Sequence, residues 1–103
     1  MRKLIVKRKF SIVECASKIY LYVQCAKRNS THTIDGVYYM AIRIKNGKTV
    51  EADILDDQPT MLIIGSSTAN TPYTVPAGTE DVRLMVRPHY NPAEGNPFTF
   101  EAM

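Results

Sequence analysis

Hydrophobic and polar side chains alternate with a period of two through most of this 103-residue chain. The alternation is clearest in residues 4–10, 19–24, 38–45, 82–87 and 98–100. A period of two places successive side chains on opposite faces of a β-sheet, whereas an amphipathic helix needs a period near 3.6. No stretch carries an apolar stripe at the helical spacing, so the pattern predicts an all-β protein.

Turn-forming residues separate the alternating segments at short intervals. They are Asp35-Gly36, Asn46-Gly47, Gln58-Pro59, Gly65-Ser66-Ser67, Pro76-Ala77-Gly78 and Asn91-Pro92. The apolar run at residues 61–64 is typical of a central strand covered on both faces. About seven or eight short strands at this spacing predict a small antiparallel β-sandwich, with a small β-barrel as the alternative. The length predicts a single domain over residues 1–103.

The Asn46-Gly47 pair limits how the two segments beside it can pair. A two-residue turn would set Ile42 opposite Glu51 and mix apolar and acidic side chains on one face. A three-residue loop, with Gly47 in the left-handed region, would set Ile42 opposite Val50 and keep one face apolar. We therefore expect the second register. A third arrangement places the two strands in different sheets that face each other across the core.

The composition is that of an ordinary globular protein, with 45% hydrophobic and 22% charged residues. The formal net charge of +3 is unevenly distributed. The first 28 residues carry eight basic side chains and one acidic, while the other 75 carry five basic and nine acidic. This separation is typical of a surface that binds anions or a second copy of the chain, or of basic residues that keep an exposed edge strand soluble.

The sequence favours a cytoplasmic protein. The apolar run Leu4-Ile5-Val6 stops at Lys7-Arg8-Lys9, whereas an export signal needs roughly 7–15 apolar residues in a row. No segment approaches the ~18 apolar residues of a membrane span. In the cytoplasm, Cys15 and Cys25 are expected to be reduced thiols.

Reactive side chains do not form a recognisable catalytic or metal-binding pattern. Cys15 and Cys25 are separated by nine residues, whereas zinc and redox sites usually place cysteines about two to four apart. His32 and His89 lie in separate polar segments. The acidic pairs Asp56-Asp57 and Glu80-Asp81 are typical of solvated turns. Ser66-Ser67 lacks the G-x-S-x-G sequence that surrounds a nucleophilic serine. We therefore expect no enzymatic activity, cofactor or metal.

The basic start of the chain is the first candidate for a binding surface. It precedes a segment in which Tyr20 and Tyr22 alternate outward, on what could be an adjacent strand. Positive charge beside aromatic rings is how several single-strand nucleic-acid binders work, although tyrosine pairs also occur as ordinary cross-strand packing. The candidate interaction surface comprises Lys7, Arg8, Lys9, Lys18, Tyr20 and Tyr22.

Residues 88–97 are the second candidate, because three prolines and one glycine make this segment unusual. Proline lowers the entropy lost on ordering, so the composition predicts an ordered loop. His89, Tyr90 and Asn91 could supply polar contacts to a small ligand there. The plainer interpretation is that the loop only closes one end of the sandwich.

Residues 19–64 contain, in order, Ile19-Tyr20-Leu21-Tyr22-Val23, Ile34-Asp35-Gly36 and Lys45-Asn46-Gly47-Lys48. This succession of a strand, an I-D-G turn and an N-G turn resembles the small PEGA-type and transthyretin-like β-sandwich modules. The resemblance implies an extracytoplasmic binding or scaffolding domain rather than an enzyme. The chain departs from these modules in lacking an export signal. In addition, Gln58-Pro59-Thr60 stands where they carry a P-G-x-H type segment.

Three further stretches run from Lys7-Arg8-Lys9 to Cys15-Ala16, over Pro76-Ala77-Gly78-Thr79-Glu80-Asp81-Val82, and from His89-Tyr90-Asn91-Pro92 to Gly95-Asn96-Pro97-Phe98. With them, the whole chain resembles a group of short bacterial β-sandwich proteins of unassigned activity. This resemblance implies a shared fold and no mechanism.

Together these patterns predict a β-sandwich that acts by binding or assembly, with self-association as the favoured interaction. Open antiparallel sheets have unpaired edges that invite strand pairing. A basic end of one copy could also meet an acidic face of another, and such an association would weaken as salt rises. The alternatives are nucleic-acid or polyanion binding through the basic segment and small-molecule binding at residues 89–97. No membrane partner is expected.

Overall fold

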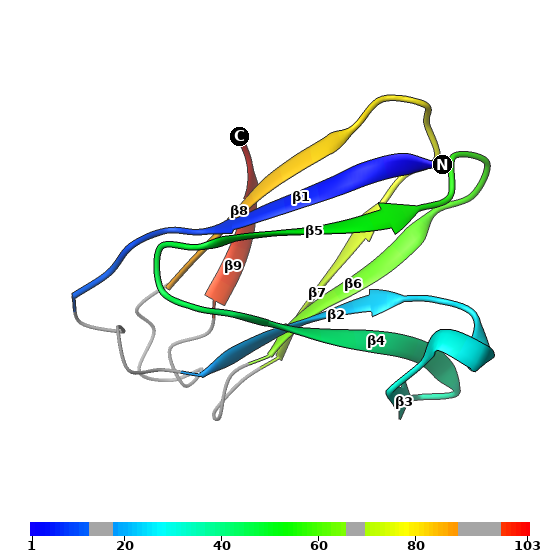
Figure 1. Cartoon of the computed structure of the whole chain (residues 1–103), viewed down its shortest axis with the longest axis horizontal. Helices are drawn as coiled ribbons and strands as arrows, with labels where there is room; N and C mark the ends of the chain where they lie inside the picture. Colours follow the sequence, from blue (N-terminus) through cyan, green and yellow to red (C-terminus); the bar gives the residue numbers. More distant parts are fainter. Residues whose placement is uncertain (13–17, 66–69, 89–97) are drawn as a thin grey trace.

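Two β-sheets pack face to face in the computed structural model of the chain (Figure 1). The structure describes residues 1–12, 18–65, 70–88 and 98–103, which contain nine strands and one short 3-10 helix. The strands are β1 (Arg2–Arg8), β2 (Ile19–Gln24), β3 (His32–Ile34), β4 (Val37–Ile44), β5 (Thr49–Ile54), β6 (Thr60–Gly65), β7 (Asn70–Val75), β8 (Val82–Pro88) and β9 (Phe98–Ala102). The helix η1 (Lys27–Asn29) connects β2 to β3.

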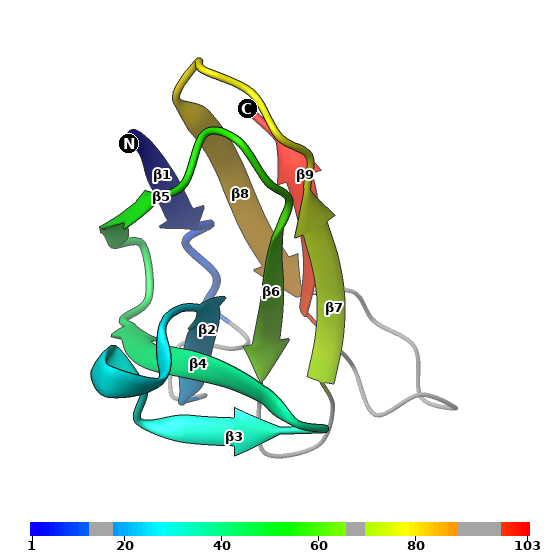
Figure 2. The same ribbon diagram turned by 90° about the vertical axis from the view of Figure 1, so that its right-hand side faces the viewer.

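The smaller sheet has the strand order β5-β1-β8-β9, and the larger has the order β3-β4-β2-β6-β7. Figure 2 shows the two layers, with β3 at the far edge of the larger sheet, away from β1 and β8. The predicted all-β sandwich is confirmed. The prediction that it is wholly antiparallel is wrong for one pair, because β1 runs parallel to β8. The strand number exceeds the expected one by the three-residue β3, which is too short to show a periodic pattern.

The core lies between the sheets and is built from one side of each long strand. In β1 the buried and exposed positions alternate, so that Leu4 and Val6 are fully buried while Lys3 and Lys7 are exposed. Fully burying one such aliphatic side chain stabilises the fold by about 1.5–3 kcal/mol. The buried cluster comprises Leu4, Val6, Ile19, Leu21, Val23, Ile44, Ile54, Leu62, Ile64, Val75, Leu84, Val86 and Phe98.

The chain changes sheets at Asn46-Gly47. Gly47 has a φ of 73°, in the left-handed region, and Lys48 N donates to Lys45 O over 3.0 Å. The expected pairing of Ile42 with Val50 is wrong, because β4 pairs with β2 and β3 while β5 pairs with β1. The third arrangement is the one observed. With β4 and β5 in different sheets, the apolar side chains of both strands face the same core between the sheets. The turn residues at Asn46-Gly47 do not by themselves require this arrangement.

Strand β6 lies inside its sheet, between β2 and β7, but only one of its faces is covered. Leu62 and Ile64 are buried, whereas Met61 is 40% exposed and Ile63 is half-buried. The prediction that residues 61–64 are covered on both faces is therefore wrong. A two-layer sandwich has no third layer, so the outer face of each sheet stays open to solvent.

Candidate functional site

The basic strand β1 lies inside the smaller sheet, between β5 and β8. The interpretation of its basic residues as protection for an edge strand is therefore wrong. Lys7 lies on the outer face of this sheet, and Lys9 follows the end of the strand; both are exposed. Neither lysine lies in the layer that carries the tyrosines.

Arg8 points inward, although we predicted from the sequence that it belongs to the candidate interaction surface. It is 2% exposed, its Nη1 donates to Ile44 O over 2.9 Å, and its guanidinium carbon lies 5.3 Å from the centre of the Phe98 ring. Arg8 shares its strand face with Leu4 and Val6. The prediction that Arg8 belongs to a binding surface is therefore wrong, because the strand period directs it into the sandwich.

Acidic residues distant in sequence lie next to the basic ones in space. Lys3 Nζ is 2.9 Å from Asp53 Oδ1, because β5 pairs with β1. The hydrogen bond to Asp53, with its charge, raises the pKa of Lys3. In the same sheet, Arg87 Nη1 lies 3.5 Å from Glu101 Oε1. The charge separation along the chain is thus partly cancelled in the fold, which weakens the electrostatic case for salt-dependent assembly or polyanion binding.

Tyr20 and Tyr22 lie on the outer face of the larger sheet, as their parity predicts. However, β1 and β2 belong to different sheets, so the two strands are not adjacent. Lys18 precedes β2 and is exposed. The six predicted residues therefore do not form one surface, since they divide among the core and the outer sides of the two layers.

The two outer faces differ in charge. The strand registers place on the outer face of the smaller sheet Lys3, Ile5, Lys7, Thr49, Glu51, Asp53, Arg83, Met85, Arg87, Thr99 and Glu101. They place on the outer face of the larger sheet His32, Ile34, Val37, Tyr39, Ala41, Arg43, Tyr20, Tyr22, Gln24, Met61, Ile63, Gly65, Asn70, Pro72 and Thr74. Among the latter, Arg43 alone carries a formal charge at neutral pH. We call this second set the tyrosine face.

Aromatic rings are packed together on the tyrosine face. The rings of Tyr22 and His32 lie 5.2 Å apart at 76°, an edge-to-face contact. Tyr39 stands between His32 and Gln24 in the strand register and is only 2% exposed. Gln24 Oε1 accepts a hydrogen bond from Met61 N over 2.9 Å. The face is thus already ordered by contacts of its own side chains.

Burial, with a smaller contribution from the negative charge of Asp35, raises the pKa of Tyr39. The unfolded chain therefore ionises this phenol at a lower pH than the folded protein does. We expect the free energy of unfolding to fall as pH rises above about 10, the usual tyrosine pKa. Urea unfolding at pH 8 and pH 11 checks this. Tyr39→Phe should lessen the fall, whereas Tyr20→Phe, at a 36% exposed position, should not.

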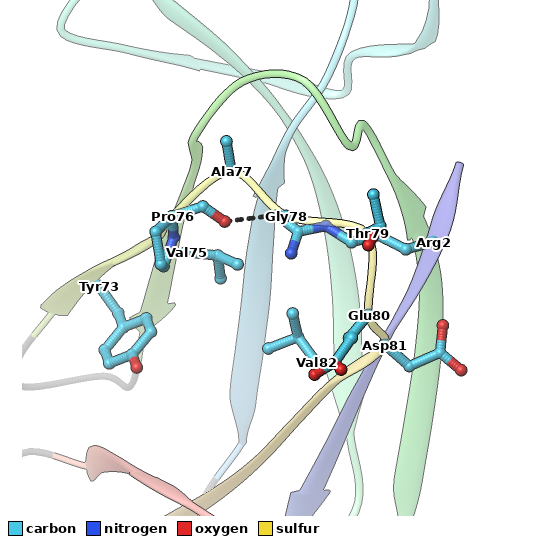
Figure 3. Close-up of a pocket in the computed structure, with 10 residues that line it drawn as sticks. All are labelled: Arg2, Tyr73, Val75, Pro76, Ala77, Gly78, Thr79, Glu80, Asp81 and Val82. Carbon is cyan, nitrogen blue, oxygen red and sulfur yellow. Dashed lines mark hydrogen bonds between the residues drawn. The ribbon is translucent and has the colours of Figure 1, made fainter.

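A pocket of about 500 Å³ opens at the end of the sandwich where β7 connects to β8. Its walls are Tyr73 and Val75 of β7, the connection of residues 76–81, Val82 of β8, and Arg2 of β1. Figure 3 shows the Arg2 side chain running along this connection, with its guanidinium at the Pro76 carbonyl. Pockets of about 300–1,000 Å³ with apolar walls and few polar groups are the usual form of small-ligand sites.

Arg2 holds the end of the sandwich together. It is 6% exposed and donates from Nε to Leu55 O over 3.2 Å and from Nη2 to Pro76 O over 2.5 Å. Gly78 N in turn donates to Asp56 O over 2.9 Å, which joins the same two connections. In the sequence, Arg2 was noted only as one of the eight basic residues near the start of the chain. Its even parity with Leu4 and Val6 was the available signal that it points inward.

His89, Tyr90 and Asn91 lie outside the described residues, as does Cys15. Cys25 is a half-buried free thiol. The described ranges contain no group of three or more potential metal ligands. They also contain no helix long and apolar enough to cross a membrane.

Comparison of the chain with protein-family models, with curated proteins and with solved structures finds no match. The resemblances to transthyretin-like modules and to short bacterial proteins therefore stay predictions.

Proposed function

We propose that this protein is a non-enzymatic cytoplasmic interaction module that self-associates through the tyrosine face. The contrast between its two outer faces carries the proposal. The outer face of the smaller sheet carries charged side chains of both signs. The tyrosine face carries tyrosines, a methionine and a single arginine. Protein interfaces are depleted in charged residues at their centre and enriched in tyrosine, methionine and arginine.

A second copy of the chain is the partner that this face fits best. The face is nearly neutral, so it needs no strongly charged partner. A two-fold axis would pack the face against itself and allow the Arg43 side chains of the two copies to lie apart. Tyrosine hydroxyls and the amides of Gln24 and Asn70 supply both donors and acceptors, which suits a self-complementary contact.

The size of the face sets the expected strength of the dimer. Five strands about 4.8 Å apart and about six residues long give a face of roughly 24 by 20 Å. That is roughly 500 Å², below the ~800 Å² per partner of a standard interface. We therefore expect a weak, concentration-dependent dimer. Since the contact is mostly uncharged, it should persist as salt rises, unlike the association that the charge distribution along the chain predicted.

Matched glutamate variants on the two faces test the proposal. Met61→Glu introduces a charge on the tyrosine face, and Met85→Glu introduces the same charge on the opposite face. Sedimentation of the full chain at low and high salt should show a dimer that Met61→Glu weakens at least about tenfold, equivalent to about 1.4 kcal/mol. Met85→Glu should leave it unchanged.

Two outcomes would contradict the proposal. One is a wild-type chain that stays monomeric at the highest attainable concentration in both salts. The other is dissociation by Met85→Glu but not by Met61→Glu, which would move the interface to the charged face. Circular dichroism melts of both variants establish that each is folded.

A further inference from the structure

The guanidinium of Arg2 has hydrogen-bond donors left over at a buried position. A guanidinium carries five N–H donors, and Arg2 uses two of its nitrogens on Leu55 O and Pro76 O. No carboxylate forms an ion pair with Arg2 in the part of the chain that the structure describes. Buried cations are normally paired, because removing a charge from water is costly. Arg2 is thus a buried cation held by neutral groups.

The space beside this guanidinium is open and partly apolar. Nη1 lies 3.1 Å from where a Cβ would stand at Gly78, so a larger residue there would crowd this nitrogen. The pocket that Arg2 lines is about 500 Å³ and has Tyr73, Val75 and Val82 among its walls. Figure 3 shows these three side chains on the same side of the connection as the guanidinium. A positive group therefore lies at one side of an open pocket whose walls are partly polar and partly apolar.

The two acidic residues at the pocket do not neutralise Arg2. Asp81 Oδ1 accepts a hydrogen bond from Lys3 N over 2.9 Å, and Figure 3 shows its side chain directed away from the pocket. Glu80 lines the pocket and is exposed, but in Figure 3 it does not extend toward the guanidinium. The charge of Glu80 would therefore repel an anion in the pocket, and a multiply charged anion most strongly.

We propose that this pocket binds a small monocarboxylate with an apolar body, such as an aryl- or alkyl-substituted acetic acid. Arginine and carboxylate form charge-assisted, often bidentate hydrogen bonds. The apolar walls would cover the hydrocarbon part of the ligand. A phosphate has no such part and carries more charge toward Glu80, so it fits less well. The site is independent of the tyrosine face and does not require self-association.

Phenylacetate, its neutral isostere phenylacetamide and inorganic phosphate are the probes that test the site. Each is titrated into the full ¹⁵N-labelled chain in a carboxylate-free buffer and followed by amide and arginine Nε–H shifts. Phenylacetate should give saturable shifts at Gly78, Thr79, Val82 and Arg2. The expected dissociation constant is on the order of 1 mM, since a ligand of about ten non-hydrogen atoms gains little binding free energy. Phenylacetamide and phosphate should bind at least tenfold more weakly.

Charge-removing variants assign the effect to named residues. Glu80→Gln removes a negative charge from the pocket wall and should tighten phenylacetate binding at least threefold. Glu51→Gln makes the same change on the outer face of the smaller sheet and should leave the binding unchanged. Arg2→Gln should abolish binding. If Arg2→Gln does not fold, the Glu80→Gln and Glu51→Gln pair still decides the matter.

The proposal is overturned if phenylacetate gives no saturable shifts in either the wild type or Glu80→Gln. Equal binding of phenylacetamide would also overturn it, because the charge would then play no part. Tighter binding of phosphate than of phenylacetate would reject the carboxylate class. None of these results bears on the dimer, which sedimentation tests separately.

Discussion

Val6→Asp will prevent the chain from folding, whereas Lys7→Asp, one residue further along β1, will leave it folded. Val6 is fully buried in the middle of the smaller sheet, between β5 and β8. An unpaired carboxylate there must either lose its hydration or be protonated, at a cost of several kcal/mol. A protein of this kind is stable by only about 5–15 kcal/mol, and the lost valine packing adds to the penalty.

Lys7 is the matched position, since its side chain is exposed on the outer face of the same strand. We expect Lys7→Asp to change the free energy of unfolding by less than about 1 kcal/mol. Far-ultraviolet circular dichroism and urea unfolding of both variants provide the measurement. A folded Val6→Asp with a midpoint near that of the wild type would show that the two layers do not enclose this side chain.

Arg8→Ala will lower the free energy of unfolding by about 3 kcal/mol, although a count of charges would rank Arg8 as a surface residue. The substitution removes the hydrogen bond from Nη1 to Ile44 O and the guanidinium near the Phe98 ring. Losing a hydrogen bond made by a charged group costs about 1.5–3 kcal/mol. A cation–π contact adds about 0.5–2 kcal/mol, and the space left by the side chain adds a cavity term.

Lys9→Ala is the control, because Lys9 is exposed and carries the same charge one position beyond the strand. It should stay within about 0.5 kcal/mol of the wild type. Arg8→Met should lie between the two, since methionine keeps much of the volume but loses the hydrogen bond to Ile44 O. Urea unfolding of all three gives the ranking. Equal losses for Arg8→Ala and Lys9→Ala would mean that Arg8 acts only through its charge.

The two arginines of β1 explain why its buried row is not wholly apolar. Arg2 and Arg8 occupy the two ends of the row, and Leu4 and Val6 occupy its middle. At each end, the long side chain spans apolar surface and its guanidinium reaches backbone carbonyl groups, from Leu55 and Pro76 at one end and from Ile44 at the other. Arg8 thereby joins the smaller sheet to β4 of the larger one.

The candidate sites were only partly predictable. The outward direction of Tyr20 and Tyr22 follows from their alternation with Leu21, and the structure agrees. The environment of these tyrosines does not follow, because it depends on which strands lie beside β2. His32 from the polar segment after β2 packs against Tyr22, and Tyr39 is buried on the outer side of its sheet. The Arg2 pocket likewise depends on connections 53 and 74 residues away in sequence.

Local patterns along the chain predict most of the inward-facing side chains and the positions where the chain turns. In the alternating segments 4–10, 19–24 and 82–87, one parity supplies buried residues, among them Leu4, Val6, Leu21 and Leu84. Turn chemistry placed breaks at Asp35-Gly36 and Asn46-Gly47, where positive φ angles occur. These features are local, since strand pleating and backbone sterics act over two to four residues.

The folded arrangement, rather than any local pattern, sets which strands are neighbours. It placed β4 and β5 in different sheets, β1 parallel to β8, and acidic β5 beside basic β1. It also enclosed Arg2 and Arg8, which share the inward parity of their strand but which their charge alone would assign to the surface. The physical reason is that a period of two shows which side chains lie on the same face of a strand, but not which other strands pair with it. Partner choice depends on the apolar area buried by the whole chain, to which distant segments contribute jointly.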